Sequence, residues 1–108
     1  MKISELEPSS NFDSLIARIL SKQGPSRVGS RAKGMKFLWN FLLADDTGTI
    51  VLSLWGVHAG DNYKTGEVIR ISNGWCKSYA GQKQVSLGRE GKIHKLPDDP
   101  SLPRQLEP

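Results

Sequence analysis

Cysteine and histidine are scarce in this chain. Its 108 residues include one cysteine, Cys76, and two histidines, His58 and His94. A single cysteine cannot form an intramolecular disulfide, and it cannot supply the cysteine cluster of a structural zinc site. The two histidines lie far apart in the sequence and show no metal-ligand spacing. The sequence therefore predicts a protein without a disulfide, a metal or another cofactor.

Long apolar segments and catalytic motifs are also missing. No apolar run approaches the roughly 20 residues of a transmembrane helix, and the opening residues Met1–Glu5 do not resemble a signal peptide. No nucleophile–base pair, phosphate-binding loop or metal cluster indicates an enzyme. These absences predict a soluble, cytoplasmic protein that is not an enzyme and has no membrane partner.

Acidic residues are missing from one long segment. The chain has 15 Lys and Arg against 11 Asp and Glu, which gives a formal net charge of +4. Between Ser14 and Ala44 there is no acid, and this segment carries six basic residues: Arg18, Lys22, Arg27, Arg31, Lys33 and Lys36. A one-sided positive field attracts polyanions, of which nucleic acid is the commonest. A solvated basic loop without a partner is the alternative interpretation.

The clearest positive signal is a strand that follows a turn at residues 45–48. The two aspartates of the turn can fold back onto nearby amides, and its glycine can take a positive φ. Residues then alternate with period two, so that Ile50, Leu52 and Leu54 share one purely aliphatic face. That face is predicted to be core. Trp55 lies on the opposite face, where it can pack under a neighbouring element or offer a flat surface to a ligand.

Residues 37–44 read as the partner strand of a hairpin with this one. Trp39 and Phe41 alternate with Leu38 and Leu42 along the segment. Because Asn40 belongs to the second set, we place Trp39 and Phe41 in the core.

The rest of the chain divides into short segments. Residues 12–20 have a helical spacing, but the all-β context favours a strand. Residues 23–36 contain three glycines, a proline and little to bury, and are predicted to be a long mobile loop. The remaining predictions are a short helix or irregular connection at 57–63, a strand at 67–79, a turn at 80–81, and a strand at 82–87.

Five strands with a long first loop, and a short helix or loop between strands three and four, describe an all-β protein. The arrangement fits a five-stranded Greek-key barrel of the oligonucleotide/oligosaccharide-binding (OB) fold. Val85 and Leu87 are predicted core residues of the last strand. We expect one OB-fold nucleic-acid-binding domain at residues 1–93, followed by a Pro-rich polar tail at residues 94–108.

Aromatic and basic residues fall where an OB barrel binds its ligand. Aromatic rings at a barrel mouth can stack on unpaired bases, and cations beside them can contact the phosphates. The candidate stacking residues are Trp55, Trp75 and Tyr79, and the candidate phosphate contacts are Arg27, Arg31, Lys33, Lys77 and Lys83. Strict alternation would place Trp75 in the core with Ile69 and Ile71. We therefore expect a β-bulge at Asn73-Gly74 that turns Trp75 outward.

Several segments, in order, resemble a known family. They are Asp46-Thr47-Gly48, Leu54-Trp55-Gly56, residues 66–71 (GEVIRI) and residues 88–93 (GREGKI). Together they are similar to the single-stranded DNA-binding proteins of the archaeal simple type, which resemble the DNA-binding barrels of replication protein A and the SOSS-B proteins. The resemblance runs from about Ile3 to about Ile93.

This resemblance implies that bases stack on Trp55, Trp75 and Tyr79 and that basic residues of the first loop contact phosphates. It also implies a nucleoid-associated protein, with replication or repair proteins as further partners. Many family members continue into a long Gly-rich or acidic tail that binds partners, whereas this sequence ends at Pro108. Either recruitment through such a tail is missing, or the sequence is a trimmed domain.

Three functions are consistent with these features. The leading hypothesis is a protein that coats and protects single-stranded DNA in replication, recombination and repair. The alternatives are a scaffold subunit of a larger repair complex, which would use Leu38 and Leu42 as part of an apolar patch, and an RNA-binding OB domain. Binding to oligothymidine separates the first from the second, and competition with RNA separates the first from the third.

Overall fold

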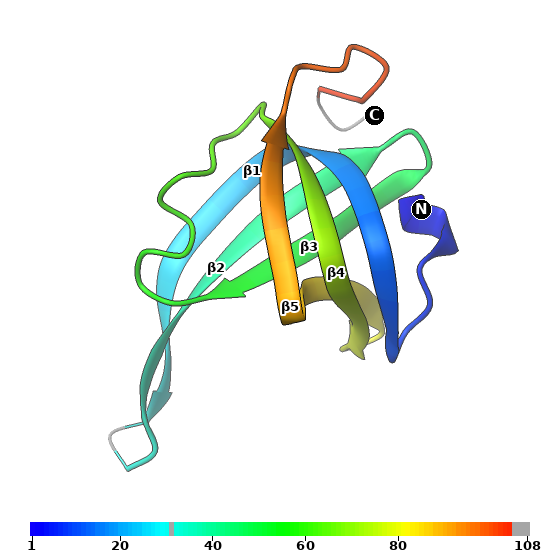
Figure 1. Ribbon diagram of the computed structural model, residues 1–108. Helices are drawn as coiled ribbons and strands as arrows, with labels where there is room; N and C mark the ends of the chain where they lie inside the picture. Colours follow the sequence, from blue (N-terminus) through cyan, green and yellow to red (C-terminus); the bar gives the residue numbers. More distant parts are fainter. Residues whose placement is uncertain (31, 105–108) are drawn as a thin grey trace.

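The chain folds into a closed five-stranded barrel (Figure 1). The computed structural model describes residues 1–30 and 32–104. A short 3-10 helix, η1 (Ile3–Glu5), precedes five strands: β1 (Ser10–Ser30), β2 (Gly34–Asp45), β3 (Gly48–Trp55), β4 (Val68–Tyr79) and β5 (Gln82–Leu96). The strands follow one another around the barrel in the order β1-β2-β3-β5-β4. β3 and β5 pair in parallel and the other neighbours pair antiparallel.

The hairpin of β2 and β3 has the predicted alternation. Ile50, Leu52 and Leu54 are buried, as are Trp39 and Phe41 on the paired strand. Their side chains join one hydrophobic cluster inside the barrel. The core predicted for these two strands is therefore confirmed.

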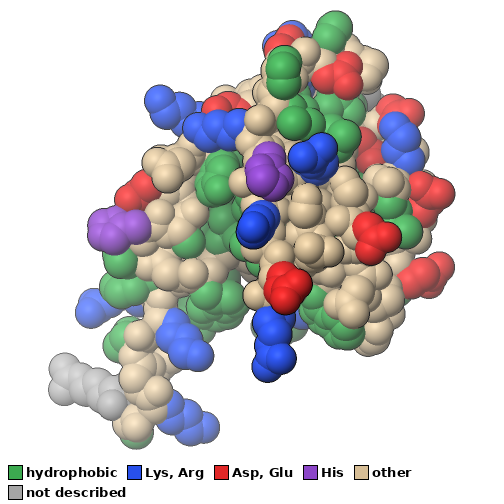
Figure 2. All heavy atoms as spheres, in the orientation of Figure 1, with side chains coloured by type: hydrophobic (Ala, Val, Ile, Leu, Met, Phe, Trp, Pro, Cys, Tyr) green, Lys and Arg blue, Asp and Glu red, His purple; other side chains and the backbone are tan. Residues whose placement is uncertain are grey.

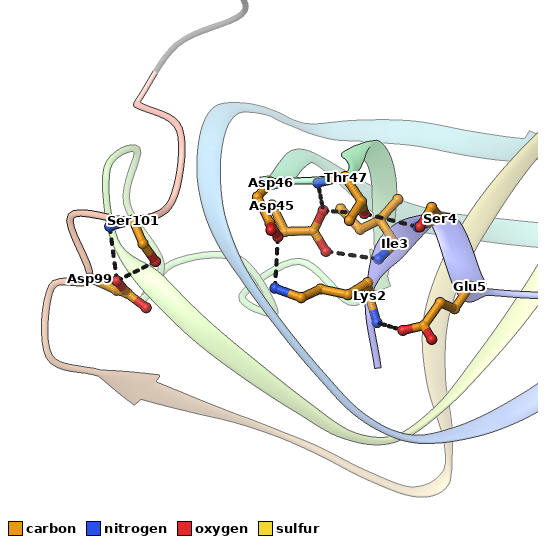
Figure 3. Close-up of polar contacts among 9 residues, drawn as sticks. All are labelled: Lys2, Ile3, Ser4, Glu5, Asp45, Asp46, Thr47, Asp99 and Ser101. Atoms are coloured by element: carbon orange, nitrogen blue, oxygen red, sulfur yellow. Dashed lines mark hydrogen bonds and ion pairs between the residues drawn. The ribbon is translucent and has the colours of Figure 1, made fainter.

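The turn between β2 and β3 is tied to the N-terminal segment (Figure 3). One carboxylate oxygen of the buried Asp45 accepts hydrogen bonds from the backbone N–H (2.7 Å) and the hydroxyl (2.6 Å) of Thr47. The other accepts the backbone N–H of Ile3 at 2.8 Å. Lys2 adds an exposed ion pair with Asp46. The aspartate turn thus also fixes η1 over one end of the barrel, where Ile3 is buried.

Residues 12–20 form a strand, as the all-β context predicted, but the mobile loop predicted for residues 23–36 is wrong. β1 continues to Ser30 and pairs with β2 from Gln23↔Asn40 to Ser30↔Gly34. The two strands form an arm that projects from the barrel (Figure 1). In a two-stranded ribbon the inner backbone groups pair with each other and water satisfies the outer ones, so this polar segment can extend into solvent. Gly24-Pro25 falls within a register shift of β1, where a missing ladder hydrogen bond is tolerated.

The bulge expected in β4 is present. Ser72 pairs with Lys92 of β5, whereas Gly74 pairs with Leu87, and Asn73 between them has φ of 55°. Beyond the shift, Gly74 and Cys76 are buried. A Cβ at position 74 would lie 2.1 Å from the ring of the buried Phe12, so this position accepts only glycine without movement.

The hairpin of β4 and β5 turns at Ala80-Gly81, as predicted, with positive φ at both residues. Val85 is buried, as predicted. Leu87 is 36% exposed, so its assignment to the core is wrong. β5 leaves the ladder directly after Leu87 and resumes pairing at Lys92, which places this side chain beside an interruption of the sheet.

The last strand is longer than predicted, since β5 continues to Leu96 rather than ending at Leu87. Residues 94–96, which the prediction assigned to the tail, pair with β4. The residues after the strand are anchored by Arg18, whose guanidinium is 1% exposed. It donates to the carbonyls of Gly66 and Asp99 and to the carboxylate of Asp98, each at 2.7 Å. The division of the chain into a domain and a tail itself stays a prediction.

The connection between β3 and β4, residues 56–67, is a series of turns, so the irregular alternative of the prediction is the correct one. Within residues 1–30 and 32–104, no helix is long and apolar enough to cross a membrane. The same residues contain no cluster of three or more His, Cys, Asp or Glu that could hold a metal ion.

Candidate nucleic-acid interface

One outer face of the barrel can be followed across four strands from their pairing registers. On β2 and β3 the outward residues lie opposite one another, as the pairs Leu38↔Trp55 and Asn40↔Ser53. The hydroxyl of Ser53 donates to the side-chain carbonyl of Asn40 at 3.2 Å. Neighbours directly opposite on one face of a sheet are close enough to contact one ligand.

The same face continues onto β5 and β4. Val51 of β3 pairs with Gln84 of β5, and Gln84 pairs in turn with Lys77 of β4. Ser86 pairs with Trp75. We name this surface the aromatic face, made of Leu38, Asn40, Val51, Trp55, Trp75, Lys77, Tyr79, Gln84 and Ser86; Ser53 lies on the same side of β3 but is buried.

The three candidate stacking residues all belong to the aromatic face. Trp55 is 49% exposed at the end of β3, and Tyr79 is 66% exposed at the end of β4. Trp75 is half-buried and is turned outward by the bulge at Asn73, because its neighbours Gly74 and Cys76 take the core positions.

These aromatic residues follow a diagonal. Val51, Gln84 and Lys77 pair with one another and so form one row across β3, β5 and β4. Trp55 and Trp75 lie above this row, toward the C-terminal end of β3. Tyr79 lies below it, toward the N-terminal end of β3. The diagonal offers ring surface along a path rather than at one point.

The candidate basic residues are not all brought to this face. Lys77 lies on it, between Trp75 and Tyr79. Arg27 and Lys33 are exposed on the projecting arm. Lys83 lies on the opposite side of β5 from Gln84, and its ammonium donates to the carbonyl of Leu6 at 2.9 Å. Arg31 lies outside the described residues.

The arm begins where the aromatic face ends. Leu38↔Trp55 is the last pair of β2 with β3, and β2 continues from there into the arm. Lys36 shares the side of Leu38 by alternation and is exposed. Figure 2 shows Lys and Arg side chains projecting from the arm at the lower left. Lys36 was missing from the predicted site, although its spacing of two residues from Leu38 could have shown its side.

Two of the basic residues of the acid-free segment are used internally. Arg18 is buried against the C-terminal residues. Lys22 lies with its ammonium 4.8 Å from the centre of the Trp39 ring. A count of charges along the sequence therefore overstates how many cations face solvent.

A groove opens beside Trp55, between β3 and β5. It has a volume of about 590 Å³ and is lined by Ser53, Leu54, Trp55, Ala59, Tyr63, Ser86, Leu87, Gly91, Lys92, Ile93 and His94. Sequence analysis missed most of these residues, because the groove depends on how β5 departs from the barrel after Leu87.

Cys76, the one cysteine of the sequence, points into the core and is fully buried. Burial raises the pKa of its thiol, because the thiolate would be poorly solvated there. It therefore stays protonated at neutral pH and is a packing residue.

The sequence and the structure were compared with those of known proteins. No family model matches the sequence. The chain is 30% identical over 98 residues to the single-stranded DNA-binding protein Ssb of Saccharolobus solfataricus, across 91% of this chain and 65% of that protein. It is 33% identical over 103 residues to replication factor A of Methanothermobacter thermautotrophicus, across 92% of this chain and 13% of that protein. The chain thus spans slightly less than two thirds of the first relative and a small part of the second.

Among solved structures, the OB domain of a Thermoplasma acidophilum protein superimposes with a TM-score of 0.73 at 22% identity, over 92% of this chain and 88% of that one. The chain is an OB-fold domain. The fold predicted from the strand pattern is confirmed, and so is the resemblance of the sequence to single-stranded DNA-binding proteins.

Proposed function

We propose that this OB domain binds single-stranded DNA through its aromatic face and thereby coats and protects the strand in replication, recombination and repair. The observation that carries the proposal is the diagonal of Trp55, Trp75 and Tyr79 on one solvent-facing surface. The names of the two relatives, a single-stranded DNA-binding protein and a replication factor, support it.

The mechanism is stacking assisted by charge. Unpaired bases offer faces that stack on aromatic rings, and such stacks tolerate any sequence because every base has a face. The backbone of the strand would be neutralised by Lys77 on the aromatic face and by Lys36, Arg27 and Lys33 on the arm. Lys83 has no part in this mechanism, since its ammonium already bonds the Leu6 carbonyl.

The domain acts in this proposal without catalysis. It would work in the cytoplasm at the nucleoid, where single-stranded DNA is exposed, alongside replication or repair proteins. Single-stranded RNA is a weaker ligand by the same stacking chemistry.

Competition separates this mechanism from a simple basic patch. Labelled oligothymidine bound to the domain is displaced by unlabelled single-stranded DNA, by its duplex and by RNA of matching sequence, each at the same nucleotide concentration. We expect single-stranded DNA to compete best and the duplex worst, because a duplex hides the base faces. Equal competition by duplex and single strand would rule out stacking as the basis of binding.

A further inference from the structure

The barrel opens on one side because β3 and β5 pair only briefly. Their pairing is confined to Val51↔Gln84 and Leu52↔Val85. Beyond these pairs the last three residues of β3 pair with no strand on that side within the described part of the chain, and the groove of about 590 Å³ opens between them and β5. Trp55 forms one wall of the groove and also ends the diagonal of the aromatic face.

The opposite wall is fixed by the departure of β5 from the sheet. Residues 88–91 leave the ladder with β4 and pack back against the bulge at Asn73. A Cβ on Gly91 would lie 2.8 Å from the Cβ of Leu87 and 2.9 Å from the carbonyl oxygen of Asn73. Because of this close packing, the partly exposed Leu87 lines the groove. Lys92 and Ile93, where β5 pairs with β4 again, line the same wall.

The third wall comes from the connection between β3 and β4. Tyr63 lies edge-on to the buried ring of Phe41, with the ring centres 6.2 Å apart. The ammonium of Lys95 lies 5.9 Å from the centre of the Tyr63 ring. The tyrosine is therefore supported from the core on one side and by a cation on another.

The lining of the groove matches one kind of ligand. Leu87, Ile93 and the rings of Trp55 and Tyr63 are apolar surface, and the hydroxyl of Ser86 adds a polar group. Of the lining residues in the described ranges 1–30 and 32–104, only Lys92, His94 and Tyr63 have ionisable side chains, and none carries a carboxylate. An apolar floor with a cation at its rim and no negative charge suits a group that is flat, apolar on its faces and attached to an anion.

We propose that the groove binds one nucleotide of the same DNA strand, the neighbour of the base that stacks on Trp55. The base packs against Leu87 and Ile93, and its phosphate is held by Lys92. The groove is continuous with the aromatic face through Trp55, which is why a nucleotide of the bound strand is its occupant. This inference rests on the proposed function and adds a subsite to it.

Two variants test the subsite. Lys92→Glu reverses the charge at the rim, and Leu87→Glu places a negative charge on the floor. Both side chains are exposed, so the variants keep the core. Lys2→Glu is the matched control for Lys92→Glu, because it makes the same change of net charge and lies beside the Asp46 turn at the other end of β3 from Trp55. Affinity for a 15-residue oligothymidine is measured by anisotropy over a salt series, and each variant is melted to establish that it is folded.

We expect Lys92→Glu and Leu87→Glu to lose about tenfold in affinity each, the range of one base–aromatic contact, and Lys2→Glu to stay within twofold of the wild type. The log–log salt slope of Lys92→Glu should be shallower by about 0.7 or more, the value of one phosphate contact. If Leu87→Glu proves to be unfolded, Lys92→Gln replaces it. We expect Lys92→Gln to lose less affinity than Lys92→Glu and to make the salt slope shallower by the value of one phosphate contact.

The outcomes distinguish the subsite from the function. If the wild type binds oligothymidine and Trp55→Ala weakens it, but the groove variants bind like Lys2→Glu, the subsite is overturned and the proposed function stands. If the wild type does not bind oligothymidine, the proposed function and the subsite both fall. Affinity of the groove for an apolar peptide, with DNA binding unchanged in both variants, would also overturn the subsite.

Discussion

At the scale of the residue, two tryptophans of neighbouring strands have opposite roles. Trp39 is 6% exposed and its indole N–H donates to the carbonyl of Gly56 at 3.0 Å. Trp55, across the β2–β3 hairpin, is 49% exposed. The Trp39 indole packs in the core of the barrel, whereas the Trp55 indole is open to solvent, where we propose that it stacks on a base.

This difference predicts opposite phenotypes. Trp55→Ala should weaken binding to oligothymidine by about tenfold or more, because each base–aromatic stack is worth on the order of 1–3 kcal/mol, and should leave the Tm almost unchanged. Trp39→Ala should instead lower the free energy of unfolding by about 3–5 kcal/mol, the cost of emptying a core site of this size. Thermal melts beside binding curves check both. A large fall in Tm for Trp55→Ala, with normal affinity of the folded fraction, would contradict the assignment.

At the scale of the element, the arm projects from the barrel beside the aromatic face, and we propose that it extends the interface. Its strands pair from Gln23↔Asn40 to Ser30↔Gly34, and the arm holds the exposed residues Arg27, Lys33 and Lys36 away from the core. Exposed cations on a projecting ribbon can reach phosphates on either side of the stacked bases.

Charge reversal on the arm should therefore act on the salt dependence of binding. Each phosphate contact contributes about 0.7 to the log–log salt slope for a single strand. The double variant Arg27→Glu, Lys33→Glu should flatten the slope by up to about 1.4 if each residue holds one phosphate. A slope equal to that of the wild type, measured by anisotropy between low and high salt, would remove the arm from the interface.

The alternation of β3 was predictable because its pattern is local and each inward residue is aliphatic. The arm was not, because glycine, proline and serine favour loops and nothing in the sequence states that two polar segments pair. Leu87 was assigned to the core by alternation alone, which fails where β5 leaves the ladder. The outward turn of Trp75 was predictable, since glycine inside a strand marked the bulge. The placement of Lys83 away from the aromatic face was not predictable, because its partner, the Leu6 carbonyl, is distant in sequence.

The segment after β5 is a further element, and its anchoring depends on pH. The hydrogen bond from Arg18 holds the pKa of Asp98 below its ordinary value of 3.8, and a second bond from Arg104 acts in the same direction. The Asp98 carboxylate of the folded protein therefore binds a proton less readily than the same carboxylate in the unfolded chain. The stabilisation of the fold by the Arg18–Asp98 contact is fully present when the pH is above the ordinary pKa of the carboxyl. It is lost as the pH falls through the lower pKa that Asp98 has in the folded protein.

Asp98→Asn should accordingly lower the Tm at pH 7 and leave it unchanged at a pH below the lowered value, where the wild-type carboxylate is itself protonated. Asp13→Asn, a change at an exposed position of β1, is the control. An equal deficit for Asp98→Asn at both pH values, or none at pH 7, would show that the Arg18 contact does not stabilise the fold in this way.

At the scale of the whole molecule, the barrel arranges its aromatic residues along a path. From Trp55 to Tyr79 the diagonal crosses two strand spacings of about 4.8 Å and about six residues of about 3.3 Å each, a span on the order of 20 Å. At about 3.4 Å per nucleotide of a stacked strand, this span corresponds to about six nucleotides. The arm and the groove beside Trp55 lie at one end of this path, so the strand is expected to continue past it.

Intrinsic tryptophan fluorescence during a titration with oligothymidine tests stacking on this face most directly. Because Trp55 and Trp75 lie on the aromatic face and Trp39 is buried, we predict partial quenching that saturates with binding, and a much smaller quenching in Trp55→Phe. The same concentration of duplex should leave the emission nearly unchanged. Saturated binding of oligothymidine without a change in tryptophan emission, or equal quenching by the duplex, would contradict base stacking on the aromatic face.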